Sequence, residues 1–257
     1  MMDAASRKRV LQFAVGTGAL ALLWQLASLF FPDFLFPSLM QIGRRFAEIA
    51  SSGPELIEVL TTAGRILAGL AGAFLLGVVL ALILNKSRAL EAYFTPILIL
   101  LQGIPALSWV VIAIIWFHGT EFRIFFIMVV TTLPAFTFQI LAAVRSMSKD
   151  LFEMTVAFRP TRWKLFKVLV LPTVVPGILT AWKVNLGNAS RVVVVAELVG
   201  ATGGVGYQLL RQQQLFDMAG AIAWTLQLVI FVLIFQGVIG AVEHWALRWR
   251  PRSERAI

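Results

Sequence analysis

Long apolar stretches alternate with short charged ones along most of the chain. A helix needs roughly 20 residues to cross a bilayer core. Stretches of about this length or longer without Asp, Glu, Lys or Arg occupy residues 10–31, 66–85, 92–120, 124–144 and 218–242. A sixth apolar segment, 177–199, is unusual because it contains Lys183, Arg191 and Glu197. The pattern predicts an all-α membrane protein with about six transmembrane helices, the first a retained span and not a signal peptide.

Two connecting segments carry patterns of their own. Residues 37–52 have apolar positions at helical spacing with charges elsewhere, which predicts an amphipathic helix lying flat on the outer surface. Residues 200–217 open with GATGGVGY, and the glycines predict a turn after the fifth transmembrane helix. This segment lacks the closing Gly-Lys-Ser/Thr of a phosphate-binding loop, so we expect no nucleotide there.

Composition and charge support a lipid-embedded chain. Hydrophobic residues make up 59% and charged residues 14% of the 257 positions, against about 45–50% and 25% in soluble domains. The net charge is +9, and the basic residues cluster in loops beside apolar stretches. This favours contact with anionic headgroups over nucleic acid. The absence of cysteine excludes disulfides and thiolate chemistry, and no metal site is expected at the two histidines.

The distribution of Lys and Arg predicts the orientation of the chain. With a cytoplasmic N-terminus, most of the 22 basic residues fall in cytoplasmic loops, as the positive-inside rule requires. The loops then assigned to the outside contain only Arg44, Arg45, Arg123 and Arg211. Both termini are therefore predicted to be cytoplasmic. Residues 1–56 form a span and an external helix, 57–246 form the transmembrane core, and 247–257 form a basic tail.

The charged loop at residues 149–172 interrupts two very apolar segments. Asp150 and Glu153 lie where a helix N-terminus favours negative charge. Pro160 then breaks the chain, and residues 162–170 have the spacing of a second amphipathic helix. We predict a helix, a corner and a second helix beneath the membrane. Such a segment either binds a soluble partner or lies on lipid headgroups, and the spacing alone leaves both interpretations open.

This loop resembles the EAA loop of ABC-transporter permeases, whose pattern is E-A-A-x3-G-x9-I-x-L-P. Glu153 has the acidic position, while Arg159 replaces the glycine, a residue that tolerates backbone conformations unfavourable for arginine. In the family the loop forms a coupling helix held in a cleft of the ATP-binding subunit. The resemblance implies that the residues coupling this chain to an ATPase are Glu153, Met154, Thr155, Ala157, Arg159, Pro160, Leu171 and Pro172.

Other segments are similar to permeases for nitrate, sulfonate and taurine. They include LFPSLMQI at 35–42, IPALSW at 104–109 and AELVGATGGVGYQLL at 196–210. IPALSW lies where the family has an Ile-Pro-Pro-type break, so Pro105 is expected to interrupt the third span. The resemblance implies the type I importer fold, a homodimer in the bacterial inner membrane, two cytosolic ABC ATPase subunits and an extracytoplasmic solute-binding protein. ATP and Mg²⁺ would bind the ATPase, because this chain has no Walker A loop.

Polar residues at membrane depth are the candidates for a solute pathway. They are Arg191, Ser190, Asn188, Glu197, Gln102 and Gln139. Burying an arginine at this depth costs at least about 2.5–3.5 kcal/mol, so Arg191 should face a pore or an opposite charge. It either holds an anionic solute or pairs with a carboxylate such as Glu197, and the amide side chains could instead bond across helices.

Three functional classes remain to be compared. An ATP-driven importer subunit explains the charged loop. A secondary carrier or channel without an ATPase should have charges in several spans, and a membrane-embedded enzyme should have clustered His, Asp or Glu. The sequence is compatible with nitrate, sulfonates, taurine, aromatic acids and neutral vitamin precursors as the solute.

Overall fold

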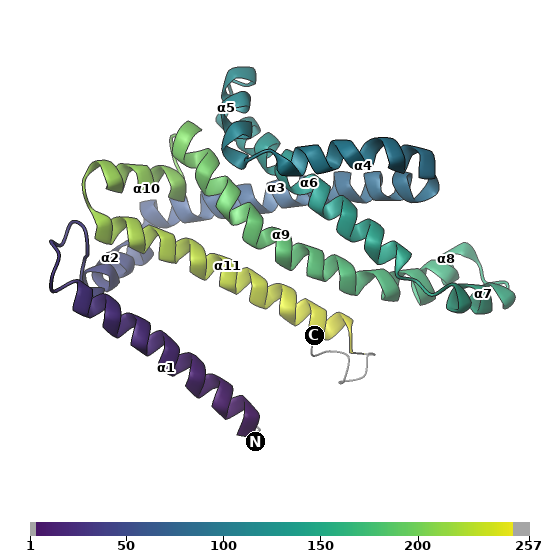
Figure 1. The fold of residues 1–257 in the computed structure, drawn as a ribbon, viewed down its shortest axis with the longest axis horizontal. Coiled ribbons are helices and arrows are strands. Elements are labelled where there is room, and N and C mark those ends of the chain that lie inside the picture. The colour runs from purple at the N-terminus through teal and green to yellow at the C-terminus, as the bar shows by residue number, and fades with distance from the viewer. Residues whose placement is uncertain (1–3, 249–257) are drawn as a thin grey trace.

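The computed structural model describes residues 4–248 and is helical along most of its length, with no strand in that range (Figure 1). The helices, in chain order, are α1 (Ala4–Ala27), α2 (Leu39–Ser51), α3 (Gly53–Lys86), α4 (Arg88–Gly103), α5 (Ala106–Trp116), α6 (Thr120–Arg145), α7 (Lys149–Ala157), α8 (Arg162–Leu165), a π-helical turn (Phe166–Val170), α9 (Leu171–Gly200), α10 (Val205–Gln214) and α11 (Met218–Ala246). The predicted all-α fold is confirmed.

Four of the described helical segments are long and apolar enough to cross a membrane: Gly53–Lys86, Thr120–Arg145, Arg162–Gly200 and Met218–Ala246. The pair α4 and α5 makes a fifth if it is counted as one span. The remaining element of the predicted six is α1, whose apolar part, Ala14–Ala27, is shorter. The basic tail predicted at 247–257 lies almost wholly outside the described residues.

The break in the third predicted span has a local cause. The axes of α4 and α5 differ by 96°. Pro105 caps α5 and has no N–H to continue a helical ladder, and Ile104 before it adopts the extended conformation that a following proline favours. The break predicted at the IPALSW segment is therefore confirmed.

Helices α3, α6 and α9 form the centre of the molecule. Small residues allow close approach: a Cβ added at Gly69 of α3 would lie 2.5 Å from the Met128 Cβ of α6, and one at Gly177 of α9 would lie 2.6 Å from the Ala143 Cβ. Between lipid-embedded helices such packing replaces the hydrophobic effect as the source of cohesion. The three helices therefore form the packed centre of the molecule, against which α4, α5, α10 and α11 lie.

The predicted amphipathic segment forms α2. Ser38 and Gln41 make a capping box at its start, and Ile42 and Ile49 are buried. Its other side is exposed, and Gln227 of α11 donates a hydrogen bond to the Phe46 carbonyl at 3.1 Å. The turn between α10 and α11 lies with α2 at one end of the molecule, and α7 and α8 lie at the opposite end (Figure 1).

Candidate functional site

The helix, corner and second helix predicted at 149–172 are present as α7, the turn at residues 158–161, and α8. Arg159 has a φ of +46°, so the arginine at the glycine position of the motif adopts the left-handed conformation that glycine would adopt without strain. This conformation costs a non-glycine residue about 1–2 kcal/mol. Thr161 then caps α8 by accepting a hydrogen bond from the Lys164 N–H.

The second helix of this loop differs from the single α-helix predicted over 162–170. After one turn of α8 the chain forms a π-helical turn that continues into α9. The Leu171 N–H bonds to the Phe166 carbonyl, five residues back, and Pro172 cannot donate to the ladder. Leu171 and Pro172 therefore lie at the start of α9, where the loop joins a membrane-spanning helix.

Apolar side chains on this loop project away from the protein. The exposed fraction is 82% for Phe158, 71% for Trp163 and 56% for Met154. Phe158 and Met154 border a groove of about 500 Å³ whose other walls include Thr155, Arg159, Pro160 and Lys164. Glu153 and Ala157 are exposed on α7 beside it. An exposed apolar patch with a charged border is typical of a surface that binds another protein.

An ion pair anchors the start of this loop. The Arg145 guanidinium at the end of α6 makes two hydrogen bonds to the Glu91 carboxylate of α4, at 2.6 and 2.7 Å. The two-point geometry fixes the relative orientation of the two helix ends. A second ion pair joins Lys183 of α9 to Glu243 of α11.

A polar cavity of about 530 Å³ lies where the α4–α5 break meets α6 and α9. Four of the six predicted pathway residues line it together: Gln102, Gln139, Asn188 and Arg191. Asn185, also in its wall, donates a hydrogen bond to the Gln139 Oε1 at 2.8 Å. Arg191 is exposed and donates to the Gly187 carbonyl at 3.0 Å. Within residues 4–248 its guanidinium has no carboxylate partner.

The other two predicted pathway residues lie elsewhere. Ser190 is buried and donates to the Gly187 carbonyl at 3.0 Å. Glu197 is fully buried and pairs with Arg65, at 2.7 Å, and not with Arg191. The alternative in which Arg191 is neutralised by Glu197 is therefore wrong. Arg191 and Glu197 both belong to α9, but Arg191 lines the polar cavity whereas Glu197 is enclosed by α3 and α10.

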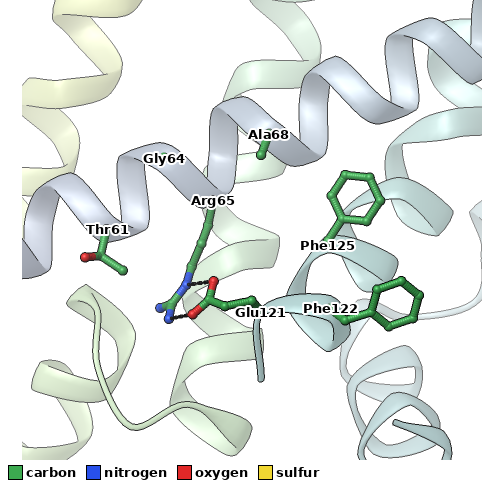
Figure 2. A pocket seen from close by; sticks show the side chains of 7 residues that line it. All are labelled: Thr61, Gly64, Arg65, Ala68, Glu121, Phe122 and Phe125. Carbon is green, nitrogen blue, oxygen red and sulfur yellow. Dashed lines mark hydrogen bonds and ion pairs between the residues drawn. The ribbon is translucent and has the colours of Figure 1, made fainter. Parts of the chain in front are cut away.

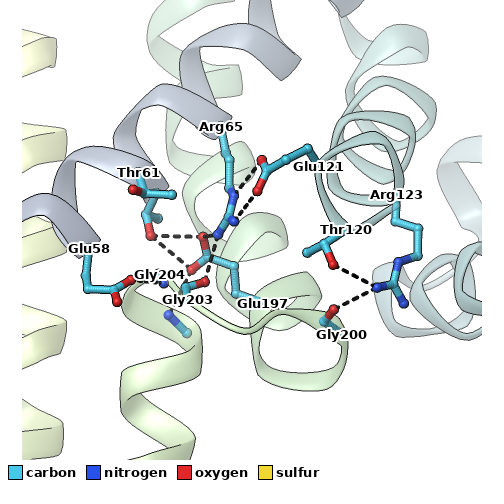
Figure 3. A network of polar contacts seen from close by, with 12 residues as sticks. Glu58, Thr61, Arg65, Thr120, Glu121, Arg123, Glu197, Gly200, Gly203 and Gly204 are labelled. Atoms are coloured by element: carbon cyan, nitrogen blue, oxygen red, sulfur yellow. Dashed lines mark hydrogen bonds and ion pairs between the residues drawn. The ribbon is translucent and has the colours of Figure 1, made fainter. Parts of the chain in front are cut away.

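Glu197 is the centre of a buried polar cluster (Figure 3). Its carboxylate accepts hydrogen bonds from the Thr62 hydroxyl at 2.9 Å, from Arg65 at 2.7 Å and from the Gly206 N–H at 2.9 Å. Arg65 also donates to the Gly203 carbonyl at 2.8 Å. We call Thr62, Arg65, Glu197 and the Gly203–Gly206 backbone the Glu197 clamp. It joins α3, α9 and the start of α10.

The outer rim of the clamp is more open. Arg65 makes two hydrogen bonds to the Glu121 carboxylate of α6, whose side chain is 71% exposed (Figure 2). Beside this pair is a pocket of about 470 Å³ lined by Gly64, Ala68 and Phe125, among others. Arg123 holds the end of α9 by donating to the Gly200 carbonyl at 3.1 Å (Figure 3).

The glycine-rich turn predicted after the fifth transmembrane helix is confirmed, and the clamp explains its composition. Gly204 has a φ of +107°, and a Cβ there would lie 2.4 Å from a carboxylate oxygen of Glu197. Its N–H also bonds to the Glu58 carboxylate of α3. Only glycine fits both this backbone conformation and this close approach to the Glu197 carboxylate. Glycine-rich loops often bind phosphate through their backbone N–H groups. In this loop the N–H groups of Gly204 and Gly206 instead bind the carboxylates of Glu58 and Glu197 in the same chain.

The family described as "Binding-protein-dependent transport system inner membrane component" matches residues 73–248. The chain belongs to this family. It is thus an ABC-transporter permease of the type I importer kind and a multi-pass protein of the bacterial inner membrane. It is a transport subunit and not an enzyme.

Individual relatives cover nearly the whole permease. It is 26% identical to the formylaminopyrimidine transport permease protein ThiX of Halalkalibacterium halodurans, over 91% of this chain and 94% of the relative. It is 24% identical to the taurine transport system permease protein TauC of Escherichia coli, over 93% and 90%. The inward-facing structure of the MetNI methionine ABC transporter has the same fold, with a TM-score of 0.63, 18% identity, and 76% and 99% coverage.

The clamp is the part of this permease that sequence reasoning missed. The partners Arg65 and Glu197 are 132 residues apart, and nothing in either local pattern pairs them. One signal for this pair was present in the sequence. Arg65 and Glu197 each place a charge in an apolar span, and charges at membrane depth tend to pair with one another.

The clamp predicts unequal effects for its two carboxylates. Glu197→Gln should destabilise the permease by about 3–5 kcal/mol, because it leaves Arg65 without its buried counter-charge. Glu121→Gln should cost at most about 1 kcal/mol, because exposed ion pairs contribute little. Thermal unfolding of the purified variants in the same detergent measures both. Equal losses of stability would contradict the assigned role of Glu197.

Proposed function

We propose that this permease, paired with a second copy, forms the solute path of an importer that two cytosolic ABC ATPase subunits drive. In this proposal both termini and the 149–172 loop face the cytoplasm, and α2 and the α10–α11 turn face outward. An extracytoplasmic binding protein delivers the solute. The basic residues concentrated at the α7–α8 end support this orientation.

The exposed α7–α8 surface is the observation that best supports coupling to an ATPase. The patch of Met154, Phe158 and Trp163 is too apolar for a free cytosolic surface. Two charged side chains beside it, Glu153 and Lys164, can add specificity to a protein interface. Burial of the apolar side chains by an ATPase subunit would let its closure move the start of α9, because α8 continues into α9 without a loop.

The polar cavity is the proposed solute path. Arg191, Asn188, Gln102 and Gln139 offer one positive charge and several amide groups around about 530 Å³. A guanidinium without a carboxylate partner attracts anions, and planar donors match carboxylate or sulfonate oxygens. We therefore propose a small anionic solute of the nitrate, sulfonate or taurine type. The names of the relatives include both taurine and formylaminopyrimidine. The proposed anionic class of the solute therefore rests on the residues that line the cavity, and not on the relatives.

The coupling proposal predicts that changes in the 149–172 loop uncouple the ATPase from the permease. Glu153→Ala, or Pro160→Ala at the corner, should abolish stimulation of the ATPase by the loaded binding protein and reduce uptake at least tenfold. The complex should still assemble, because Glu153 and Pro160 lie outside the helical core. The matched control is Glu55→Gln, an acidic residue at the start of α3, which should behave as wild type. Normal stimulation in the loop variants would contradict the coupling role.

The solute proposal predicts a charge requirement at position 191. Arg191→Gln should reduce uptake of an anionic solute at least tenfold, while Arg191→Lys should retain part of it because the charge remains. The solute is first identified by screening the cognate binding protein against nitrate, sulfonates, taurine and vitamin precursors. Arg88→Gln, which removes an exposed cation at the start of α4 outside the cavity, is the control and should keep wild-type uptake. Wild-type uptake by Arg191→Gln would rule out an anion contact.

A further inference from the structure

A π-helical turn joins the 149–172 loop to the helix that lines the polar cavity. The turn spans Phe166–Val170, and the Leu171 N–H bonds to the Phe166 carbonyl, five residues back. With α8 and α9 it forms one continuous helical segment, Arg162–Gly200, whose start lies at the α7–α8 end of the molecule (Figure 1). Single π-helical turns within α-helices are rare and are frequent at functional sites. This turn lies between two of the proposed functional regions.

The local sequence explains why the helix widens here. In a regular α-helix the Pro172 ring would clash with the carbonyl of Val168, four residues before it, and proline has no N–H to donate. A π-helical bond spans one more residue than an α-helical bond, so the turn moves these groups out of the clashing register. Thr173 also donates its hydroxyl to the Leu169 carbonyl at 2.8 Å, a contact that often bends helices. Pro172 therefore favours the wider turn.

The two sides of the turn are held unequally. Near the start of α9, a Cβ added at Gly177 would lie 2.6 Å from the Ala143 Cβ of α6. Further along, Lys183 pairs with Glu243 of α11, and the Glu197 clamp holds the other end. By contrast, no residue of α7 or α8 is buried. A change in the turn would therefore rotate the loop, because α9 is fixed by its neighbours.

The size of that rotation follows from helix geometry. Each residue of an α-helix contributes about 100° of rotation and about 1.5 Å of rise. Conversion of the π-helical turn to regular α-helix would bring one additional residue into this register. It would thus turn α8 by up to about 100° relative to α9. The groove bordered by Met154, Phe158 and Lys164 would then face a different direction.

We propose that Pro172 is a positioning residue that acts through this turn: by favouring the π-helical register, it sets the direction in which the α7–α8 groove faces relative to α9. The inference rests on the proposed function, because it takes the groove to be the surface that an ATPase subunit binds. Pro172 needs no contact with the ATPase or the solute for this role. With the loop in the observed direction, closure of the ATPase displaces α9, and with the loop rotated the same closure does not reach the cavity.

The test compares two variants that differ in helical register. Pro172→Ala should convert the turn to α-helix, and ATPase stimulation and solute uptake by the permease–ATPase complex should both fall at least tenfold. Deletion of Lys167 in the Pro172→Ala background removes the residue that the conversion adds, so the loop should return to its original direction. Lys167 suits this deletion because it is exposed and lies outside the groove lining. The double variant should recover most of the wild-type uptake, although it lacks both the proline and the π-helical turn.

The direction of the loop is measured separately from activity. The chain has no cysteine, so spin labels at Arg162→Cys on α8 and Tyr93→Cys on α4 report one distance in the assembled complex. Both sites are exposed. This distance should change by several ångströms in Pro172→Ala and return to its original value in the deletion variant. Pro176→Ala is the matched control, because Pro176 lies one turn further on, within the α-helical part of α9. It should change neither the distance nor uptake.

Each outcome decides for or against the positioning role. Wild-type uptake by Pro172→Ala would overturn it, and so would lost uptake with an unchanged label distance. A deletion variant that regains the label distance but not the uptake would also overturn it, because the proline itself would then be required. So would an equal loss of uptake in Pro176→Ala. The proposed function fails separately, if the wild-type complex with ATP and binding protein takes up no solute.

Discussion

The buried carboxylate of Glu197 is the constraint on which the rest of the structure depends. A charge without solvent is tolerated only when opposite charge and hydrogen-bond donors surround it, and Thr62, Arg65 and the Gly206 N–H meet this need. Because these donors come from α3 and the start of α10, one carboxylate joins three elements. The same requirement explains Gly204, whose missing Cβ leaves room for the carboxylate.

Helix α9 connects every proposed functional region. It begins at the π-helical turn after α8, carries Asn188 and Arg191 in the wall of the polar cavity, and ends beside the clamp. A displacement at the start of α9 could therefore reach both the cavity and the opposite end through one continuous helix. In the proposed importer this is how an ATPase at α7–α8 would alter access to the solute path.

The sequence predicted those features that depend on local chemistry. Apolar length indicated α6 and α11, Pro105 indicated the break between α4 and α5, and the charged stretch before Pro160 indicated the corner. It could not predict pairing between distant residues such as Arg65 and Glu197, and so placed Glu197 among the pathway residues. Arg159 shows a further limit, because its left-handed backbone depends on the surrounding turn and contradicts the usual preference of arginine.

In the proposed importer, this permease moves solute only when an ATPase acts on the α7–α8 loop. Reconstitution in proteoliposomes tests this dependence, with solute and binding protein on one side of the membrane and ATP with Mg²⁺ on the other. Uptake is expected when the ATPase subunits are present, and none above empty liposomes when they are omitted or when ATP is withheld. Sustained uptake by the permease alone, with or without an ion gradient, would contradict this dependence.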